Sequence, residues 1–222
     1  MRAAIVLGVL AISAPARAEM VCEGGPLPPQ TLDGQIRAAG SGGVIIAANE
    51  LPDWRFRDIN RLLRPHVEVV APGLAIYHPP PVADPELALE DATQVVRARL
   101  PRALVAERPL DPPALKRVVF IHEPRAERTM VLAEVTGKVP EGAIGVVVSR
   151  VVGAERVAMA WNTVRTGASD FALWHSPTVC QPRVASLIMP TVGETVEIRW
   201  LDASGRLSEP SRTLTVARAP AK

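Results

Sequence analysis

The chain has 222 residues, a hydrophobic fraction of 48%, 22 prolines and a formal net charge of +2. This length gives room for one large domain or two small ones, and the apolar content supports a hydrophobic core and excludes general disorder. Proline breaks helix interiors but is tolerated between strands and on sheet edges, so the composition favours many short strands with stiff connections.

The first residues have the pattern of a secretory signal peptide. Arg2 is followed by an apolar run over 5–12, and Ala16-Arg17-Ala18 is a small-x-small cleavage site. The mature chain is therefore expected to begin at Glu19, after a signal peptide of residues 1–18. The apolar run is too short for a permanent membrane anchor, and an uncleaved N-terminal anchor is the alternative. We expect a periplasmic or secreted protein that is not integral to the membrane.

Cleavage changes the charge of the chain. Residues 1–18 contain Arg2, Arg17 and no acidic residue, so the formal charge falls from +2 to 0. A neutral chain lacks the basic surplus that electrostatic binding of nucleic acid requires, so we expect no nucleic-acid partner.

Cys22 and Cys180 are the only cysteines. In an exported protein, two cysteines are most simply one disulfide. This bond would tie the start of the mature chain to its C-terminal half and stabilise the fold by roughly 5 kcal/mol in the chain-entropy model. A pair of free thiols and an intermolecular bridge are the alternatives.

The first half of the chain predicts a small β-domain. A Gly- and Pro-rich leader over 19–30 precedes a short buried strand at 44–48. Residues 54–57 alternate aromatic and Arg side chains, which predicts a strand, whereas Ile59, Leu62 and Leu63 have helical spacing. Further along, the pattern predicts a hairpin of residues 66–71 and 74–78 around Pro72-Gly73. One helical turn is possible at 85–91, and another alternating strand is expected at 93–100.

The second half predicts a β-sandwich. A Pro-rich linker at 109–117 separates an N-terminal domain, 19–108, from a C-terminal domain, 118–217, which is followed by a short tail, 218–222. Gly or Pro recurs between apolar segments about ten residues apart, which is the rhythm of an all-β sandwich. Strands are expected at 118–121, 130–136, 144–152, 157–161, 171–174, 196–200 and 213–217, with a turn at 202–205.

Residues 118–217 resemble a bacterial fibronectin type III-like or immunoglobulin-like module, above all in the stretch EIRWLDASGRLSEPSRTLTV. The matching residues are Asp202, Gly205, Ser208, Pro210 and the run Thr213–Val216. The first half resembles the same class more faintly. The resemblance implies an all-β chain of two tandem Ig-like or fibronectin III-like sandwich domains, and it implies a fold and not an activity.

No local motif indicates catalysis, so we expect no catalytic residue, no cofactor and no metal. None of the four histidines has a partner at the spacing of a local metal-ligand pair, so a metal site would need at least three of them to converge: His66, His78, His122 and His175. A glycosidase needs two facing carboxylates in a cleft, and no pair stands out among Glu86, Glu90, Asp91, Glu123, Glu127 and Glu134.

One stretch is a candidate ligand surface: Trp161 with Asn162, and Trp174 with His175. An exposed tryptophan beside polar groups can stack on a sugar or a peptide. The alternative is that Trp161 and Trp174 belong to the core or cover a sheet edge.

These observations favour a non-catalytic binding or structural protein of the bacterial cell envelope, with an envelope protein or a glycan as its partner. The alternatives are an envelope carbohydrate-binding factor or hydrolase with a site between the domains, and a metal-binding periplasmic protein. A deep polar pocket between the domains with converging acidic residues or histidines would favour the enzyme, whereas a flat interface would favour the binding or structural protein.

Overall fold

The computed structural model describes residues 37–38, 43–48, 51, 53–58, 61–78, 80, 86–90, 95–99, 108–123, 128–175, 187–202 and 205–220. Within these ranges the regular structure is entirely β, which confirms the all-β prediction, and no helix has the length and apolar character needed to cross a membrane. The predicted signal peptide, the leader and both cysteines lie outside the described residues.

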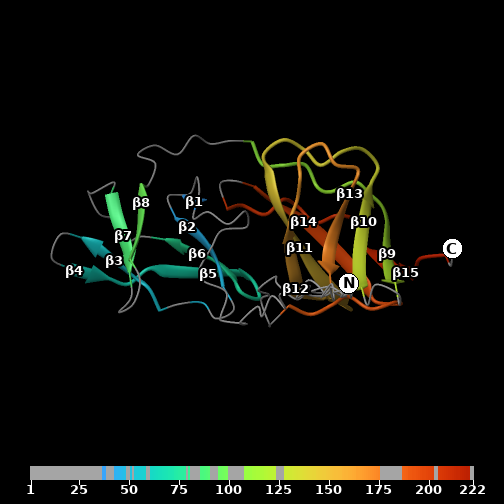
Figure 1. The fold of residues 1–222 in the computed structure, drawn as a ribbon, viewed down its shortest axis with the longest axis horizontal. Helices are drawn as coiled ribbons and strands as arrows, with labels where there is room; N and C mark the ends of the chain where they lie inside the picture. Colours follow the sequence, from blue (N-terminus) through green and yellow to red (C-terminus); the bar gives the residue numbers. More distant parts are fainter. Residues whose placement is uncertain are drawn as a thin grey trace, which may run out of the picture.

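Two four-stranded antiparallel sheets form the N-terminal unit, which is at the left of Figure 1. The first sheet has the order β1 (Arg37–Ala38), β2 (Val44–Ala47), β6 (Leu74–His78) and β5 (His66–Ala71). The second has the order β4 (Arg61–Leu63), β3 (Arg55–Asp58), β7 (Glu86–Glu90) and β8 (Val95–Arg99). The core between them is formed by Val44, Ile46, Trp54, Phe56, Ala75 and Tyr77.

A seven-stranded sheet forms the C-terminal unit. Its order is β12 (Glu155–Thr163), β11 (Ala143–Val152), β14 (Thr195–Asp202), β15 (Leu214–Arg218), β9 (Leu115–Glu123), β10 (Arg128–Val135) and β13 (Asp170–His175). Only the pair of β15 with β9 is parallel within this sheet. The sheet curls until its edge strands approach, and the Asn162 Nδ2 of β12 donates to the Ala172 carbonyl of β13 at 3.0 Å. The result is a nearly closed barrel-like sheet around a core that includes Val146, Leu173 and Ile198.

Two buried serines bind the segment that follows β14 to the edge of β14 that β15 does not cover, since β15 pairs with β14 only at Thr195 and Val196. Asp202 closes the preceding turn, since its carboxylate accepts from the Arg206 backbone N and Nε at 3.0 Å each. Beyond the turn, the Ser208 and Ser211 hydroxyls accept from the backbone N of Trp200 and Ile198, each at 3.0 Å. The serine backbone N atoms donate back to the Trp200 and Ile198 carbonyls at 2.9 and 2.8 Å. The hydroxyls thus satisfy strand donors beside Pro210, which has no N–H of its own.

The first sheet of the N-terminal unit is covered on both faces. One face lines the core shared with the second sheet. The opposite face packs on the outside of β11 and β14 in what we call the interface cluster: Ile45, Ala47, Ala71, Leu74, Ile76, Val147 and Leu201. Burial on both faces explains why Val44 to Ala47 and Val146 to Val148 are apolar without alternation.

Most predicted strands are confirmed, and the hairpin at Pro72-Gly73 has the predicted bounds, with Gly73 at φ 69°. The helical turn expected at 85–91 is wrong, because Glu86–Glu90 is strand β7 and pairs with both β3 and β8. The helical alternative for Leu62 and Leu63 is also wrong, because both residues pair with β3 as part of β4.

The predicted linker 109–117 ends too late. Strand β9 already begins at Leu115, which is buried in the barrel core. Its carbonyl accepts from Arg212 Nη2 at 3.0 Å. Arg117 and Lys116 therefore belong to the strand, and the connector between the units, as far as it is described, is 108–114.

Candidate functional site

Trp161, the first residue of the candidate ligand surface, lies where the two units meet. Its ring packs against the interface cluster, and its indole N–H donates to the Pro72 carbonyl of the β5–β6 turn at 2.9 Å. The side chain is half-buried. Trp161 therefore joins residues that are 89 positions apart in the sequence.

The other three residues of that surface have different surroundings. Trp174 is 9% exposed and belongs to the barrel core. Asn162 faces β13, where it bonds to Ala172, and its Oδ1 accepts from the Thr163 backbone N at 2.9 Å. His175 stands opposite Met130 at the end of β13. Trp161 and Asn162 are neighbours on one strand and so point to opposite faces, and the four residues do not share one face.

The described histidines form one close pair. His66 and His78 are cross-strand partners with stacked rings, 5.9 Å between centroids, and His78 Nε2 lies 3.1 Å from Glu68 Oε2. His122 is on β9, with its Nδ1 3.0 Å from the Thr129 hydroxyl, and His175 is on β13. In the described part of the chain, no group of three or more His, Cys, Asp or Glu residues is arranged to hold a metal ion.

Glu134, one of the acidic residues considered for hydrolysis, is paired with two basic side chains. Glu134 bonds to Arg117, and its Oε2 lies 3.7 Å from Lys116 Nζ. The hydrogen bond from Arg117 lowers the pKa of the Glu134 carboxyl, so this group stays ionised near neutral pH. Glu123 is exposed, Glu86 and Glu90 begin and end strand β7, and Asp91 and Glu127 lie outside the described residues.

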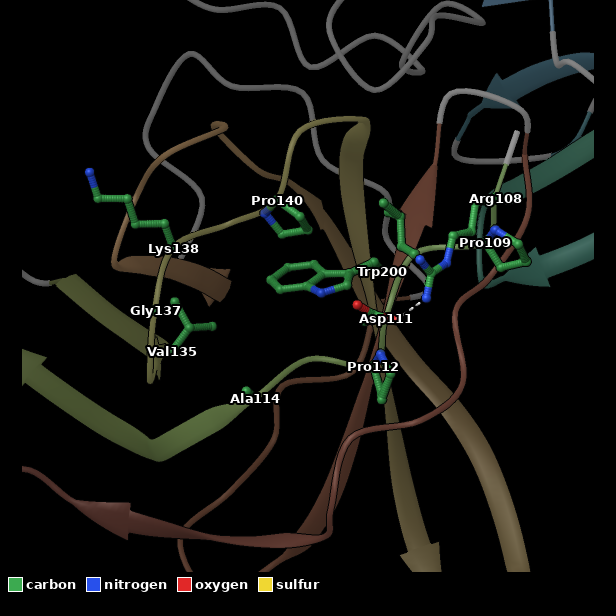
Figure 2. Close-up of a pocket in the computed structure, with 11 residues that line it drawn as sticks. Arg108, Pro109, Asp111, Pro112, Ala114, Val135, Gly137, Lys138, Pro140 and Trp200 are labelled. Atoms are coloured by element: carbon green, nitrogen blue, oxygen red, sulfur yellow. Dashed lines mark ion pairs between the residues drawn. The ribbon is translucent and has the colours of Figure 1, made fainter. Parts of the chain in front are cut away.

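A cavity of about 380 Å³ lies at one end of the barrel (Figure 2). Its walls come from three places: the connector 108–114, the β10–β11 turn over 137–140, and the strand residues Val135 and Trp200. The Thr136 backbone N donates to the Ala114 carbonyl at 2.7 Å and fixes the connector against this turn. Figure 2 shows the indole of Trp200 in the middle of the lining residues.

Sequence patterns did not indicate this cavity. The prolines predicted a linker at 109–117, and Trp200 falls at the end of the strand predicted at 196–200. Each interpretation describes one wall. No local pattern places residues 108–112 beside 137–140, because that contact depends on where β9, β10 and β11 lie in the sheet. The sequence feature most closely related to the cavity is the presence of Pro109 and Pro112 in the connector and of Pro140 in the β10–β11 turn.

Comparison of the chain with models of known protein families and with curated proteins found no match. The assignment of a function therefore depends on the residues and contacts described above.

Proposed function

We propose that the chain is an exported, non-catalytic binding or structural protein of the cell envelope. The observation that carries this proposal is the contact between its two units. The interface cluster is apolar and buried, and the Trp161–Pro72 hydrogen bond lies beside it. Contacts of this kind restrict domain motion. Over the described residues, this contact holds the two units together as one stiff body, which suits a protein that holds other molecules at fixed positions.

The nature of this contact also separates the proposal from the enzyme alternative. An enzyme with a site between the units would need polar groups that converge in a cleft. The described residues that meet here are instead aliphatic side chains and one tryptophan, packed against each other. The apolar contact favours the binding or structural role.

We also infer that the C-terminal unit is an immunoglobulin-like sandwich. In such folds strand A pairs with B and B with E in one sheet, while C pairs with F and F with G in the other, and an extra strand C′ can extend from C. If β9 to β15 are labelled A, B, C, C′, E, F and G in chain order, every one of these pairs is present. The parallel pair of β15 with β9 joins the two sheets into one.

Export rests on the sequence of residues 1–18. It is tested by the mass of the protein recovered from the periplasm and the medium, with and without reduction and alkylation of thiols. We expect a chain that begins at Glu19 and is two hydrogens lighter than its reduced form, because Cys22 and Cys180 are bonded. An unprocessed chain with two free thiols contradicts both export and the disulfide.

The binding or structural role is tested by photo-crosslinking in living cells. A photoreactive residue replaces one exposed valine at a time: Val69 on β5, Val157 on β12 or Val192 before β14. We expect one or two positions to give adducts of a single defined mass in the envelope fraction, since a stiff body presents a fixed face to its partner. If a correctly processed chain gives no adduct at any of the three positions, the proposal is wrong.

A further inference from the structure

The barrel carries a second apolar surface on its outside, on strands β9 and β10 at the right of Figure 1. Val118 lies in the barrel core, so its neighbour Val119 and, two positions later, Ile121 point outward. Their cross-strand partners on β10 are Leu132 and Met130, which share the outward face. We call these four outward-facing residues the outer patch.

The outer patch has the character of a covered surface. Val119 and Met130 are each 8% exposed, although neither belongs to one of the three hydrophobic clusters in the described part of the chain. A solvated sheet face carries polar residues that alternate with the inward apolar ones, whereas 118–121 and 130–133 are apolar on both faces. Strand β11 has the same pattern where the first sheet covers it. By the same reasoning, a further segment is expected over the outer patch.

Strand β13 leads the chain from the outer patch toward Cys180. His175 ends β13 and stands directly opposite Met130 on β10. Cys180 follows five residues later, so it is within about 18 Å of His175 even when the chain between them is fully extended. The predicted disulfide with Cys22 would therefore hold the start of the mature chain close to β10.

The leader has the length and the composition to cover the outer patch. The 14 residues 23–36, between Cys22 and the start of β1 at Arg37, can span up to about 50 Å. Leu27 is flanked by proline on both sides, in the run PLPP. The backbones of β9 and β10 each pair on both sides, so the patch offers apolar side chains and no free strand edge. A proline-rich segment suits such a face, because proline has no N–H that would be buried without a partner.

We propose that the proline-rich leader, residues 23–32, docks on the outer patch and that the Cys22–Cys180 bond fixes it there. Leu27 then contacts the patch at Ile121 and Met130. The outer patch is separate from the interface cluster, because β15 stands between β9 and β14 in the sheet. The inference rests on the predicted disulfide and not on the envelope role.

Oxidation of Met130 tests whether the leader covers the patch. The full mature chain is treated with hydrogen peroxide, and methionine sulfoxide is followed by mass spectrometry of tryptic peptides. Leu27→Asp places a charge in the docked segment and should raise the oxidation rate of Met130 several-fold, whereas Leu27→Ile should leave it unchanged. Met159, fully buried in the barrel core, is the control and should stay protected in all three chains. An equal oxidation rate of Met130 in the three chains contradicts the proposal.

Photo-crosslinking identifies the segment that lies on the patch. A photoreactive residue replaces the half-buried Ile121, and the purified chain is irradiated, reduced, alkylated and digested with trypsin. Residues 19–37 form one tryptic peptide, because Arg37 is the first basic residue after the cleavage site. We expect this peptide to be joined to 118–125, and no such product when the photoreactive residue replaces Val157 of β12. A crosslink to residues 166–183, a crosslink to a second copy, or no crosslink overturns the proposal.

These measurements separate the ways in which the inference can fail. Reduction before digestion removes the disulfide link, so only the photo-crosslink can join the leader to β9. An oxidised chain with an uncovered patch contradicts docking, and a covered patch in a chain with two free thiols contradicts the role of the Cys22–Cys180 bond. Both experiments use the purified protein without a partner, so their outcome is independent of the proposed function.

Discussion

At the scale of single residues, Tyr77 makes the stability of the N-terminal unit depend on pH. Burial, followed by the negative charge of Asp53, raises the pKa of the Tyr77 hydroxyl to about 12 from its ordinary 10.0. The unfolded chain then ionises at a lower pH than the folded chain does. Stability from this group is complete below about pH 10 and is lost as the pH rises toward about 12.

We therefore expect the free energy of unfolding to fall between about pH 10 and 12, at up to about 1.4 kcal/mol per pH unit. Urea unfolding at several pH values measures it. Tyr77→Phe is the control and should remove this part of the slope. Because Tyr77 is the only tyrosine, tyrosinate absorbance reports its ionisation directly. Ionisation near pH 10 in the folded chain contradicts the prediction.

Glu197, like Asp202, is an acidic side chain of β14 that is buried against a basic partner. It is 4% exposed, and its Oε2 accepts from Arg156 Nε at 2.7 Å, with Arg199 Nη2 3.9 Å from the other oxygen. Glu197→Gln should lower the free energy of unfolding by about 1.5–3 kcal/mol, since it weakens a charge-assisted bond and leaves Arg156 without its counter-charge.

Chemical denaturation measures this difference. Glu194→Gln is a matched control, because Glu194 is more exposed and lies 3.3 Å from Arg150. It should cost less than about 1 kcal/mol. Equal costs for the two variants would show that burial of Glu197 does not strengthen its pair.

At the scale of elements, the segment after β14 depends on its two serine hydroxyls. Ser211→Ala removes the acceptor for the Ile198 backbone N–H, and that donor is buried. We expect a loss of about 1–3 kcal/mol in unfolding free energy and faster hydrogen exchange at Ile198. Ser211→Thr keeps the hydroxyl and should retain most of the protection. If the alanine variant exchanges as slowly as the wild type at Ile198, the hydroxyl is not the partner that protects this strand.

Patterns in the sequence predict most strands of this protein but not what covers them. Val44 to Ala47 lack alternation, which indicated a buried strand, yet nothing local showed that Val147 and Leu201 cover one face. The segment over Glu86–Glu90 is rich in good helix formers and was interpreted as a possible helical turn, whereas pairing with two neighbouring strands overrides that propensity.

The same limit applies to the candidate sites. Trp161 and Trp174 were predicted as candidate surface residues because two neighbouring residues on a strand point to opposite faces, so that one of each pair is expected to face solvent. Their exposure is decided by the residues that pack on each face of the strand from elsewhere in the fold, and the pattern of a single strand does not predict those residues. The cavity beside Trp200 was missed for the same reason, since its walls come together only through the strand order of the barrel.

At the scale of the whole molecule, the interface cluster should make the two units unfold together. Ile76→Ala, in a side chain 2% exposed, should cost about 2–4 kcal/mol and lower the melting temperature of the entire chain. Calorimetry should show a single transition in both the wild type and this variant. Val148→Ala, inside the barrel core only, is the comparison. Two separated transitions in the wild type would contradict the coupling.

The doubly covered sheet also imposes an order of events on biogenesis. The ribosome releases the N-terminal unit first, while β11 and β14, which cover Ile45, Leu74 and Ile76, follow much later in the chain. During that delay the aliphatic face of the first sheet is exposed to solvent and to neighbouring nascent chains, and exposed hydrophobic surface favours aggregation. The vulnerable period for this protein is therefore the interval between the synthesis of β6 and the synthesis of β14.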